Sequence, residues 1–375
     1  MVLFTHAAYT TFASFAGSVD IFFVVSGFLI TSLILEEDRV RGRVDVGSFY
    51  LRRVLRLFPV LYTVLFVTLI VGLLVGDAEF RRKTISDVSS AGLYMYHVVH
   101  PVGVEIGRSA LPEVRPTIHL WSLSVEEHFY LVALIMVMAV VRFRLAKWLI
   151  VVFTAIWLGI GVARLTGHVG WRYMWYQRPD ALLIGVVAAV VNAELRTVSE
   201  RAQRLLRWAT VAAIAAMGAV LLLGTGLAPT RWFIPFAPGA TGTPGQKFSD
   251  RLWWGQFGFT VTSGVTAFAV FALVRCGDWW MSRVLSLPFL RAVGRRSYCI
   301  YLVHVPLAVL LVEATKGTLT EAQALMIYLP LLPIVSELTF RYVEQPGLRL
   351  KHRFERLNPT SAKPEPEPAP GQPYY

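Results

Sequence analysis

Two carboxylates and a histidine, Glu126, Glu127 and His128, stand at the head of a long apolar run. An ionisable side chain inside a membrane is costly unless it is paired or hydrated, so its presence there indicates function. At helical spacing Ser122 and Glu126 lie on one face, beside the aromatic wall of Trp121. Glu127 points about 100 degrees away. The two carboxylates therefore need not act together, and at least one is open to pairing with an arginine as a buried structural acid.

A histidine close to the start of the chain, His6, is the second chemical candidate. Histidine titrates near neutral pH and accepts a proton from a hydroxyl within hydrogen-bond distance. Asp20 opens the next apolar run, where it would orient or charge-balance His6. The alternatives are a helix-end histidine that faces water and an ordinary helix-capping aspartate. The following Ser26-Gly27 pair favours close packing between helices.

Three arginines, Arg52, Arg53 and Arg56, precede another apolar run. Arg53 and Arg56 are three residues apart and would share one helical face. Guanidinium groups stay charged and donate paired hydrogen bonds, which suits the phosphate oxygens of an acyl donor that bears a pyrophosphate. The competing interpretation is a stop-transfer flank or a contact with lipid headgroups.

A third group of polar residues lies late in the chain. Tyr298, Tyr301 and His304 repeat every three residues and line one helical face, although ordinary aromatic packing with a helix-end histidine gives the same pattern. His97 and His100 form a lone histidine pair in a polar segment. Two ligands do not make a zinc site, so we expect no metal.

The elements that must position these side chains are membrane helices. The 375 residues are 55% hydrophobic with a mean hydropathy of +0.55, more than a soluble core requires. Nine mostly apolar runs predict membrane spans, some of them short. They are Val19–Leu35, Pro59–Val75, Leu123–Val141, Trp148–Leu165, Ala181–Val191, Trp208–Leu227, Gly255–Val274, Tyr298–Val312 and Leu325–Phe340. We predict an all-α integral membrane protein of about ten transmembrane helices, in which Met1–Tyr9 is the end of a truncated first helix.

The positive charge follows the predicted topology. The net charge is +12, and 24 of the 36 Lys and Arg residues fall on one predicted side of the membrane. The segments on this side are 36–58, 142–147, 195–207, 275–296 and 341–375. This side is expected to be cytoplasmic, and the bias explains the charge without a nucleic-acid partner. Residues 77–118 and 228–254 are expected to cap the outer side.

The remaining features set the predicted domain boundaries. Residues 1–345 are expected to form one membrane domain, followed by a cytoplasmic tail, 346–375. The tail is rich in Pro and Glu and is expected to be disordered from about residue 358. Arg178 and Asp180 flank a proline where they would orient a helix end. Cys276 and Cys299 imply no disulfide, since both lie near the cytoplasmic side.

Taken in order, these motifs resemble the acyltransferase-3 family over about residues 1–350. Besides His6, the resemblance rests on five stretches. They are Gly17–Ile30 (GSVDIFFVVSGFLI), Arg52–Pro59 (RRVLRLFP), Trp121–Tyr130 (WSLSVEEHFY), Ser297–His304 (SYCIYLVH) and Tyr342–Pro346 (YVEQP). Family members are similar ten-helix membrane enzymes that move acyl groups from cytoplasmic acyl-CoA onto hydroxyls of sugars, envelope polymers, lipids or macrolides.

The resemblance implies a role for each matching residue. His6 would be the catalytic histidine with Asp20 beside it, and Glu126 the family carboxylate. Arg53 and Arg56, with Arg52, would bind the donor. Trp121, Ser122, Glu127, Tyr298, His304 and Glu344 would support the substrate or the structure. His128 stands where Gln is usual, and the first-helix arginine of the family would precede Met1.

The expected function is membrane O-acyl transfer from acyl-CoA, with acetyl as the expected group, to a sugar-containing acceptor in a bacterial plasma membrane. His6 would act as general base or carry the acyl group covalently. The acceptor is expected to be handled by the membrane domain or by a separate extracytoplasmic protein, because no esterase-like domain is expected after the last span. The alternatives are a transporter or flippase of a lipid-linked or glycosylated substrate, and a catalytically silent scaffold.

Overall fold

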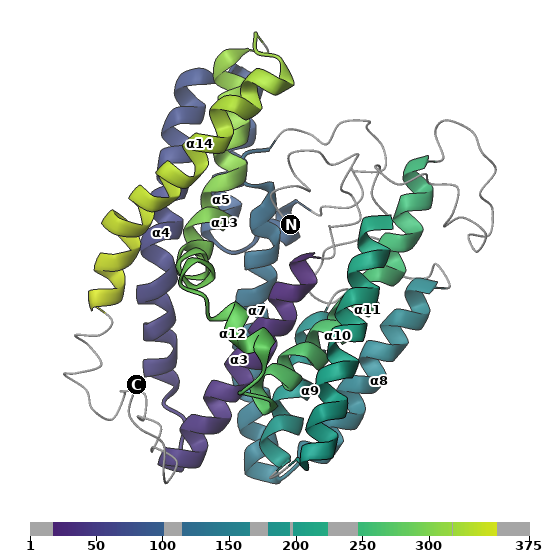
Figure 1. Cartoon of the computed structure of the whole chain (residues 1–375). Helices are drawn as coiled ribbons and strands as arrows, with labels where there is room; N and C mark the ends of the chain where they lie inside the picture. Colours follow the sequence, from purple (N-terminus) through teal and green to yellow (C-terminus); the bar gives the residue numbers. More distant parts are fainter. Residues whose placement is uncertain are drawn as a thin grey trace.

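The computed structural model describes residues 18–100, 115–165, 179–195, 198–223, 247–316 and 318–350. Every regular element in these ranges is helical, which confirms the predicted all-α class (Figure 1). Seven helices are long and apolar enough to cross a membrane, so the chain is a multi-pass membrane protein. They are α3 (Ser18–Arg41), α4 (Val46–Val75), α7 (Trp121–Phe143), α8 (Ala146–Leu165), α11 (Lys247–Arg275), α13 (Pro288–Thr315) and α14 (Glu321–Thr339).

The other helices are shorter or more polar. They are α5 (Ala78–Gly92), α6 (Tyr96–Val99), η2 (Ile118–Leu120), α9 (Asp180–Glu194), α10 (Glu200–Leu223), α12 (Trp280–Leu285) and the π-helical turn η4 (Phe340–Glu344). The predicted spans Ala181–Val191 and Trp208–Leu227 fall on α9 and α10. Helix α9 has 15 residues, which gives about 22 Å against the roughly 30 Å of a hydrocarbon core. Helix α10 opens with a charged turn and is described only as far as Leu223.

Helix α9 lies inside the bundle, packed against α3, α8 and α11. Most of its residues are buried on all sides, as expected of a helix that is apolar all round. Its closest approach is to α3. A Cβ atom added at Gly27 would lie 2.3 Å from the carbonyl oxygen of Leu182, and one added at Gly185 would lie 2.3 Å from that of Val24. The predicted close packing at Gly27 is therefore confirmed.

A buried ion pair joins α8 to the first turn of α9. Arg164 donates two hydrogen bonds to Asp180, of 2.6 and 2.8 Å, and one of 3.0 Å to Thr260 of α11. The two charged side chains are 3% and 1% exposed. Arg178 lies outside the described residues. The positive charge of Arg164 in α8 is thus neutralised by Asp180, the residue that we expected to orient a helix end.

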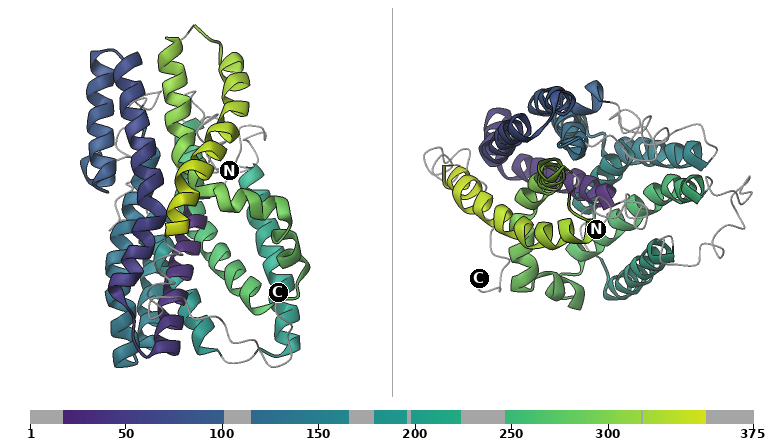
Figure 2. Two further views of the ribbon diagram at one scale, coloured as in Figure 1. Left: turned by 90° about the vertical axis from the view of Figure 1, so that its left-hand side faces the viewer. Right: turned by 90° about the horizontal axis from the view of Figure 1, so that it is seen from above.

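Helices α5 and α6 occupy part of residues 77–118, the segment that we expected to cap the outer side. Helix α5 turns back along α4, and the two run side by side in Figure 2. A Cβ atom at Gly72 would lie 2.9 Å from Thr84, and the Tyr62 hydroxyl donates a 2.8 Å hydrogen bond to the Gly92 carbonyl. Helix α6 then contacts α7. The buried positions Phe80, Thr84, Asp87 and Ala91 follow helical spacing, but Thr84 and Asp87 are polar, so hydropathy did not predict this packing.

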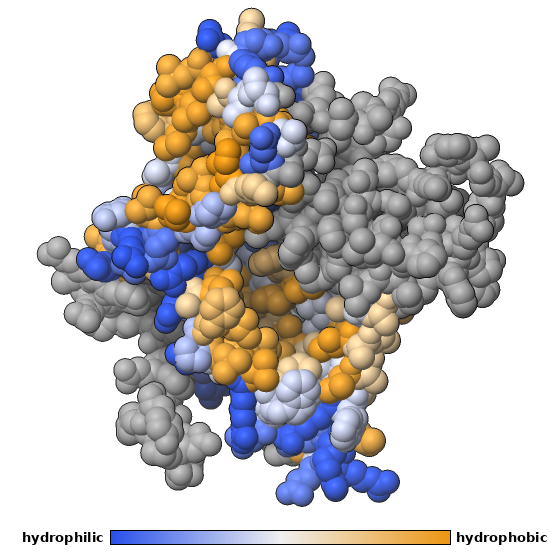
Figure 3. All heavy atoms as spheres, turned by 45° about the horizontal axis from the view of Figure 1, so that its top comes forward, coloured by the Kyte–Doolittle hydropathy of each residue, from blue (hydrophilic) through white to orange (hydrophobic). Residues whose placement is uncertain are grey.

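The outer surface of the bundle is largely apolar. Figure 3 shows hydrophobic side chains over much of the described surface in view, interrupted by groups of hydrophilic ones. Exposed examples include Phe66 and Leu74 of α4, Val151 of α8 and Met326 of α14. The connections from α3 to α4 and from α7 to α8 lie at the same end of the bundle, the lower end in Figure 1, as the charge pattern predicts.

Candidate functional site

An ion pair inside the bundle joins α4 to α7. An Nη atom of Arg53 donates a 2.9 Å hydrogen bond to Oε1 of Glu127, and the two side chains are 18% and 17% exposed. The guanidinium carbon also lies 3.7 Å from the centre of the Tyr130 ring, close enough for a cation–π contact. Glu127 is therefore the carboxylate that pairs with an arginine, an option that the sequence left open.

The neighbouring carboxylate, Glu126, has hydroxyl partners. Its Oε2 accepts hydrogen bonds from the Tyr130 hydroxyl at 3.0 Å and from the Ser26 hydroxyl at 3.5 Å. The Ser26 and Tyr130 hydroxyls also lie within hydrogen-bond distance of each other, so one of them can donate to the other in place of Glu126. Ser26, which the sequence assigned to helix packing, thus contributes a polar group from the middle of α3. Tyr130 was missed, although its position four residues after Glu126 on the same face was a usable signal.

Tyr130 connects these two interactions. Its ring lies against Arg53 and its hydroxyl bonds to Glu126, while its backbone carbonyl accepts a 3.4 Å hydrogen bond from Tyr50 of α4. We call the set Ser26, Arg53, Glu126, Glu127 and Tyr130 the central polar cluster. It brings three membrane helices together around a charged centre, and such a centre is costly unless each member is paired.

The three predicted donor-binding arginines have different surroundings. Arg52 donates a 3.1 Å hydrogen bond to Glu37, which also accepts one of 3.4 Å from Arg41. These bonds fasten the turn between α3 and α4. Arg56 is exposed, whereas Arg53 belongs to the central polar cluster. The structure therefore separates Arg53 from Arg56 instead of presenting them as one fork.

A second polar group lies where η2 and α7 meet α13. The Tyr301 hydroxyl is 2.6 Å from the Ser122 hydroxyl and donates a 2.6 Å hydrogen bond to the His119 carbonyl. The Nδ1 atom of His304 is 2.6 Å from the Tyr301 carbonyl, and its ring centre is 4.8 Å from that of His119. All four side chains are largely enclosed. His119 was not among the predicted site residues, because nothing in its spacing pointed to α13.

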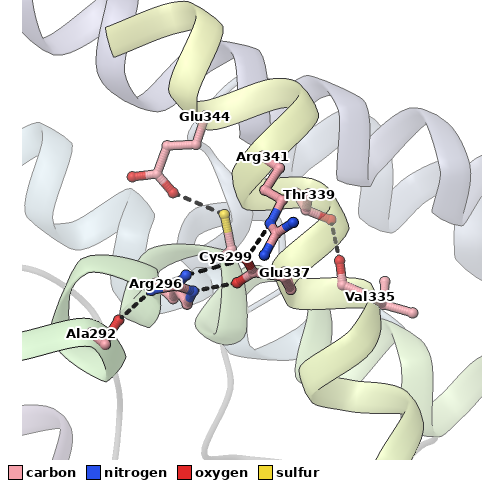
Figure 4. Close-up of polar contacts among 8 residues, drawn as sticks. All are labelled: Ala292, Arg296, Cys299, Val335, Glu337, Thr339, Arg341 and Glu344. Atoms are coloured by element: carbon pink, nitrogen blue, oxygen red, sulfur yellow. Dashed lines mark hydrogen bonds and ion pairs between the residues drawn. The ribbon is translucent and has the colours of Figure 1, made fainter. Parts of the chain in front are cut away.

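The remaining α13 residues fasten this helix to α4 and α14. Tyr298 donates a 3.0 Å hydrogen bond to the Leu57 carbonyl, and the Cys299 thiol donates one of 2.8 Å to Glu344 in the π-helical turn η4. Figure 4 shows this contact beside a second one, in which Glu337 accepts hydrogen bonds from Arg296 and Arg341. The position of Glu344 is that of a support between helices.

Two other predicted site residues, Asp20 and Trp121, lie within or against the N-terminal half of α3. Asp20 is buried in its first turn. Trp121 packs edge-on against Phe23, with ring centres 6.0 Å apart. His6 lies outside the described residues.

The two neighbouring histidines, His97 and His100, have different contacts. His97 packs against His128, with ring centres 4.9 Å apart, while His100 lies 3.3 Å from the Ser86 hydroxyl and 3.5 Å from the Asp87 carboxylate. Asp87 is buried and also accepts a 2.7 Å hydrogen bond from Arg115. Burial raises the pKa of Asp87, and the arginine opposes that shift. Within the described part of the chain, no group of three or more His, Cys, Asp or Glu is arranged to hold a metal ion.

Comparison with known proteins gives a consistent result. The acyltransferase-3 family model, described as an acyltransferase domain, matches residues 1–336. The O-acetyltransferase OatA of Staphylococcus aureus, from strains NCTC 8325 and COL alike, is 25% identical over 337 residues, which is 88% of this chain. These residues make up 52% of OatA, so the chain spans about half the length of the curated relatives it matches. No solved structure matches.

Proposed function

Because the chain belongs to the acyltransferase-3 family, we propose that it is a membrane O-acyltransferase. The donor is acyl-CoA, with acetyl as the expected group, and the acceptor is a hydroxyl of a cell-envelope glycan, an exopolysaccharide or a glycosylated small molecule. Its place is a bacterial plasma membrane, with residues 1–345 as the transferase domain and the tail in the cytoplasm. The relatives named O-acetyltransferase support the acetyl donor.

The central polar cluster is the observation on which this proposal rests. It holds one carboxylate against an arginine and leaves the other with hydroxyl partners, inside a bundle whose outer surface is apolar. A hydroxyl is also the group that an O-acyltransferase must accept as substrate. Glu126 already binds two hydroxyls, so it is suited to position a third, that of the acceptor or of a donor-binding side chain.

The reaction requires one proton acceptor and one exchange of bonds. His6 removes the proton from the acceptor hydroxyl as its oxygen attacks the carbonyl carbon of the thioester. A tetrahedral oxyanion forms, the carbon–sulfur bond breaks, and the CoA thiolate leaves and takes up a proton. Positive groups such as Arg53 favour the oxyanion. Arg56, exposed on α4 one turn from Arg53, is the better placed of the two to meet the donor phosphates.

The test is acetyl transfer from radiolabelled acetyl-CoA in membranes that contain this chain. We expect label in the glycan or glycoside fraction, lost in His6→Ala because a general base contributes about 10²–10⁴-fold. In Glu126→Gln transfer should fall about a hundredfold, the effect of misplacing a reacting group by about 1 Å. Glu36→Gln is the control, because Glu36 is a carboxylate of α3 that lies in an exposed ion pair with Arg39, outside the central polar cluster. No transfer by the unmodified chain, or full transfer by both variants, would refute the proposal and favour transport.

A further inference from the structure

His97 is a buried side chain whose hydrogen-bonding capacity is unused. It is 1% exposed, and neither ring nitrogen has a hydrogen-bond partner within the part of the chain that the structure describes. Burial lowers the pKa of His97 to about 4. The ring is therefore neutral at physiological pH and presents one N–H donor and one nitrogen acceptor. A buried polar group without hydrogen bonds destabilises the fold. The unpartnered imidazole of His97 therefore indicates that a ligand binds there.

The surroundings of His97 add further polar groups. The His128 ring lies 4.9 Å away, centre to centre, and is half-buried, so the pair is not sealed inside the bundle. One turn before His97, the Tyr94 hydroxyl is buried without a partner among the described residues, and its ring packs on Phe58. The segment 94–97 therefore contributes an unpartnered hydroxyl beside Phe58 of α4 and an imidazole against His128 of α7.

The backbone of this segment carries strain. Tyr94 has a φ of +56°, a conformation that tyrosine rarely adopts. Residues held in such conformations persist where the surrounding structure requires them, and they concentrate at binding sites. Here the strained turn directs one short segment, between α5 and α6, against the part of α7 that holds both carboxylates.

We propose that His97 and His128, with the Tyr94 hydroxyl, form the binding subsite for the sugar part of the acceptor. A sugar hydroxyl donates one hydrogen bond and accepts others, which matches a pair of imidazoles that each offer a donor and an acceptor. Sugar C–H faces also stack on aromatic rings such as Tyr94 and Phe58. An anionic ligand fits poorly, because His97 is neutral and Glu127 is adjacent. This inference rests on the proposed function and specifies its acceptor side.

Saccharide binding to the purified full chain in lipid nanodiscs tests the subsite without requiring acyl transfer. Radiolabelled chitotriose and maltotriose are the probes, measured by equilibrium dialysis, and thermal unfolding is recorded in parallel. The variants are His97→Phe and His128→Gln. His100→Phe is the matched control, since it removes a histidine of the same segment whose ring contacts Ser86 and Asp87 instead.

We expect at least one saccharide to bind, with affinity about tenfold lower in His97→Phe, the equivalent of one hydrogen bond. His97→Phe should unfold at the same or a higher temperature, because it removes an unpartnered buried polar group. His128→Gln keeps a donor and an acceptor and should retain binding within about threefold. His100→Phe should show the opposite pattern, with binding kept and stability lowered.

Failure to bind either saccharide, or equal binding by the unmodified chain and His97→Phe, would overturn the subsite. The proposed function fails separately. Saccharide binding that depends on His97, without any acetyl transfer from acetyl-CoA, would refute the transferase and leave the sugar subsite in place.

Discussion

The Arg53–Glu127 ion pair provides a quantitative test of the central polar cluster. Both side chains are more than four-fifths enclosed, so removing either partner leaves the other charge uncompensated in the bundle. Breaking a pair of this kind costs about 3–5 kcal/mol. Arg53→Leu also loses the contact with the Tyr130 ring, worth up to about 2 kcal/mol when desolvated. We therefore expect Arg53→Leu to lower the free energy of unfolding more than Glu127→Leu does.

The double variant Arg53→Leu/Glu127→Leu should behave differently. Replacing both charges by apolar side chains is often neutral or stabilising, so we expect it to be within about 2 kcal/mol of the unmodified chain. The assay is the free energy of unfolding from denaturant titration in mixed micelles, analysed as a double-mutant cycle. Acetyl transfer is measured on the same samples. A stable double variant without activity would show that the pair contributes to the chemistry and not only to the fold.

Arg39 and Glu36 supply the matched control, since their ion pair is 72% and 46% exposed. Exposed pairs contribute about 0–1 kcal/mol, and the single variants Arg39→Leu and Glu36→Leu should show no more than that. Single substitutions at Arg53 and Glu127 that cost as little as these would refute the reasoning, because the charges would then be hydrated and not enclosed. Equal destabilisation by the single and double variants would refute it as well.

Two further predictions concern packing and pH. Gly27→Ala places a methyl group 2.3 Å from the Leu182 carbonyl oxygen, so it should lower the free energy of unfolding by about 1–3 kcal/mol. Gly159→Ala should leave it unchanged, because a Cβ atom there has nothing within 4 Å. Equal unfolding temperatures of the two variants would contradict the close α3–α9 packing. His97 binds a proton more readily unfolded than folded, since burial lowers its folded pKa to about 4. Stability should therefore fall as the pH drops from about 6.5 to 4. His97→Phe should remove that part of the pH dependence, and an unchanged pH profile of its unfolding temperature would show that His97 is hydrated.

The sequence predicted which face of a helix a residue lies on better than which helix it meets. The one-residue offset between Glu126 and Glu127 predicted separate surroundings, and their different partners confirm it. The expectation that one of them pairs with an arginine is also confirmed. Which arginine pairs with Glu127 could not be predicted from the sequence. Arg53 is 74 positions away, and periodicity does not indicate which helices are neighbours.

The same limitation explains the features that were missed. Asp180 was predicted to orient a helix end, and Arg164 lies inside the predicted span Trp148–Leu165. Their pairing depends on how α8 and α9 pack, which neither run of residues encodes alone. The contact between His97 and His128 depends on α5 turning back along α4 and on α6 meeting α7, which the hydropathy of this segment did not predict.

The two adjacent carboxylates, Glu126 and Glu127, have different partners in the central polar cluster. Glu127 neutralises Arg53, and without it a guanidinium would stand uncompensated between membrane helices. Glu126 makes no ion pair among the described residues and instead accepts hydrogen bonds from Ser26 and Tyr130. Both donors are hydroxyls, and a hydroxyl of a substrate could displace either without leaving a charge unpaired. The ion pair therefore fixes α4 against α7, so that Glu126 stays in position when its own partners exchange.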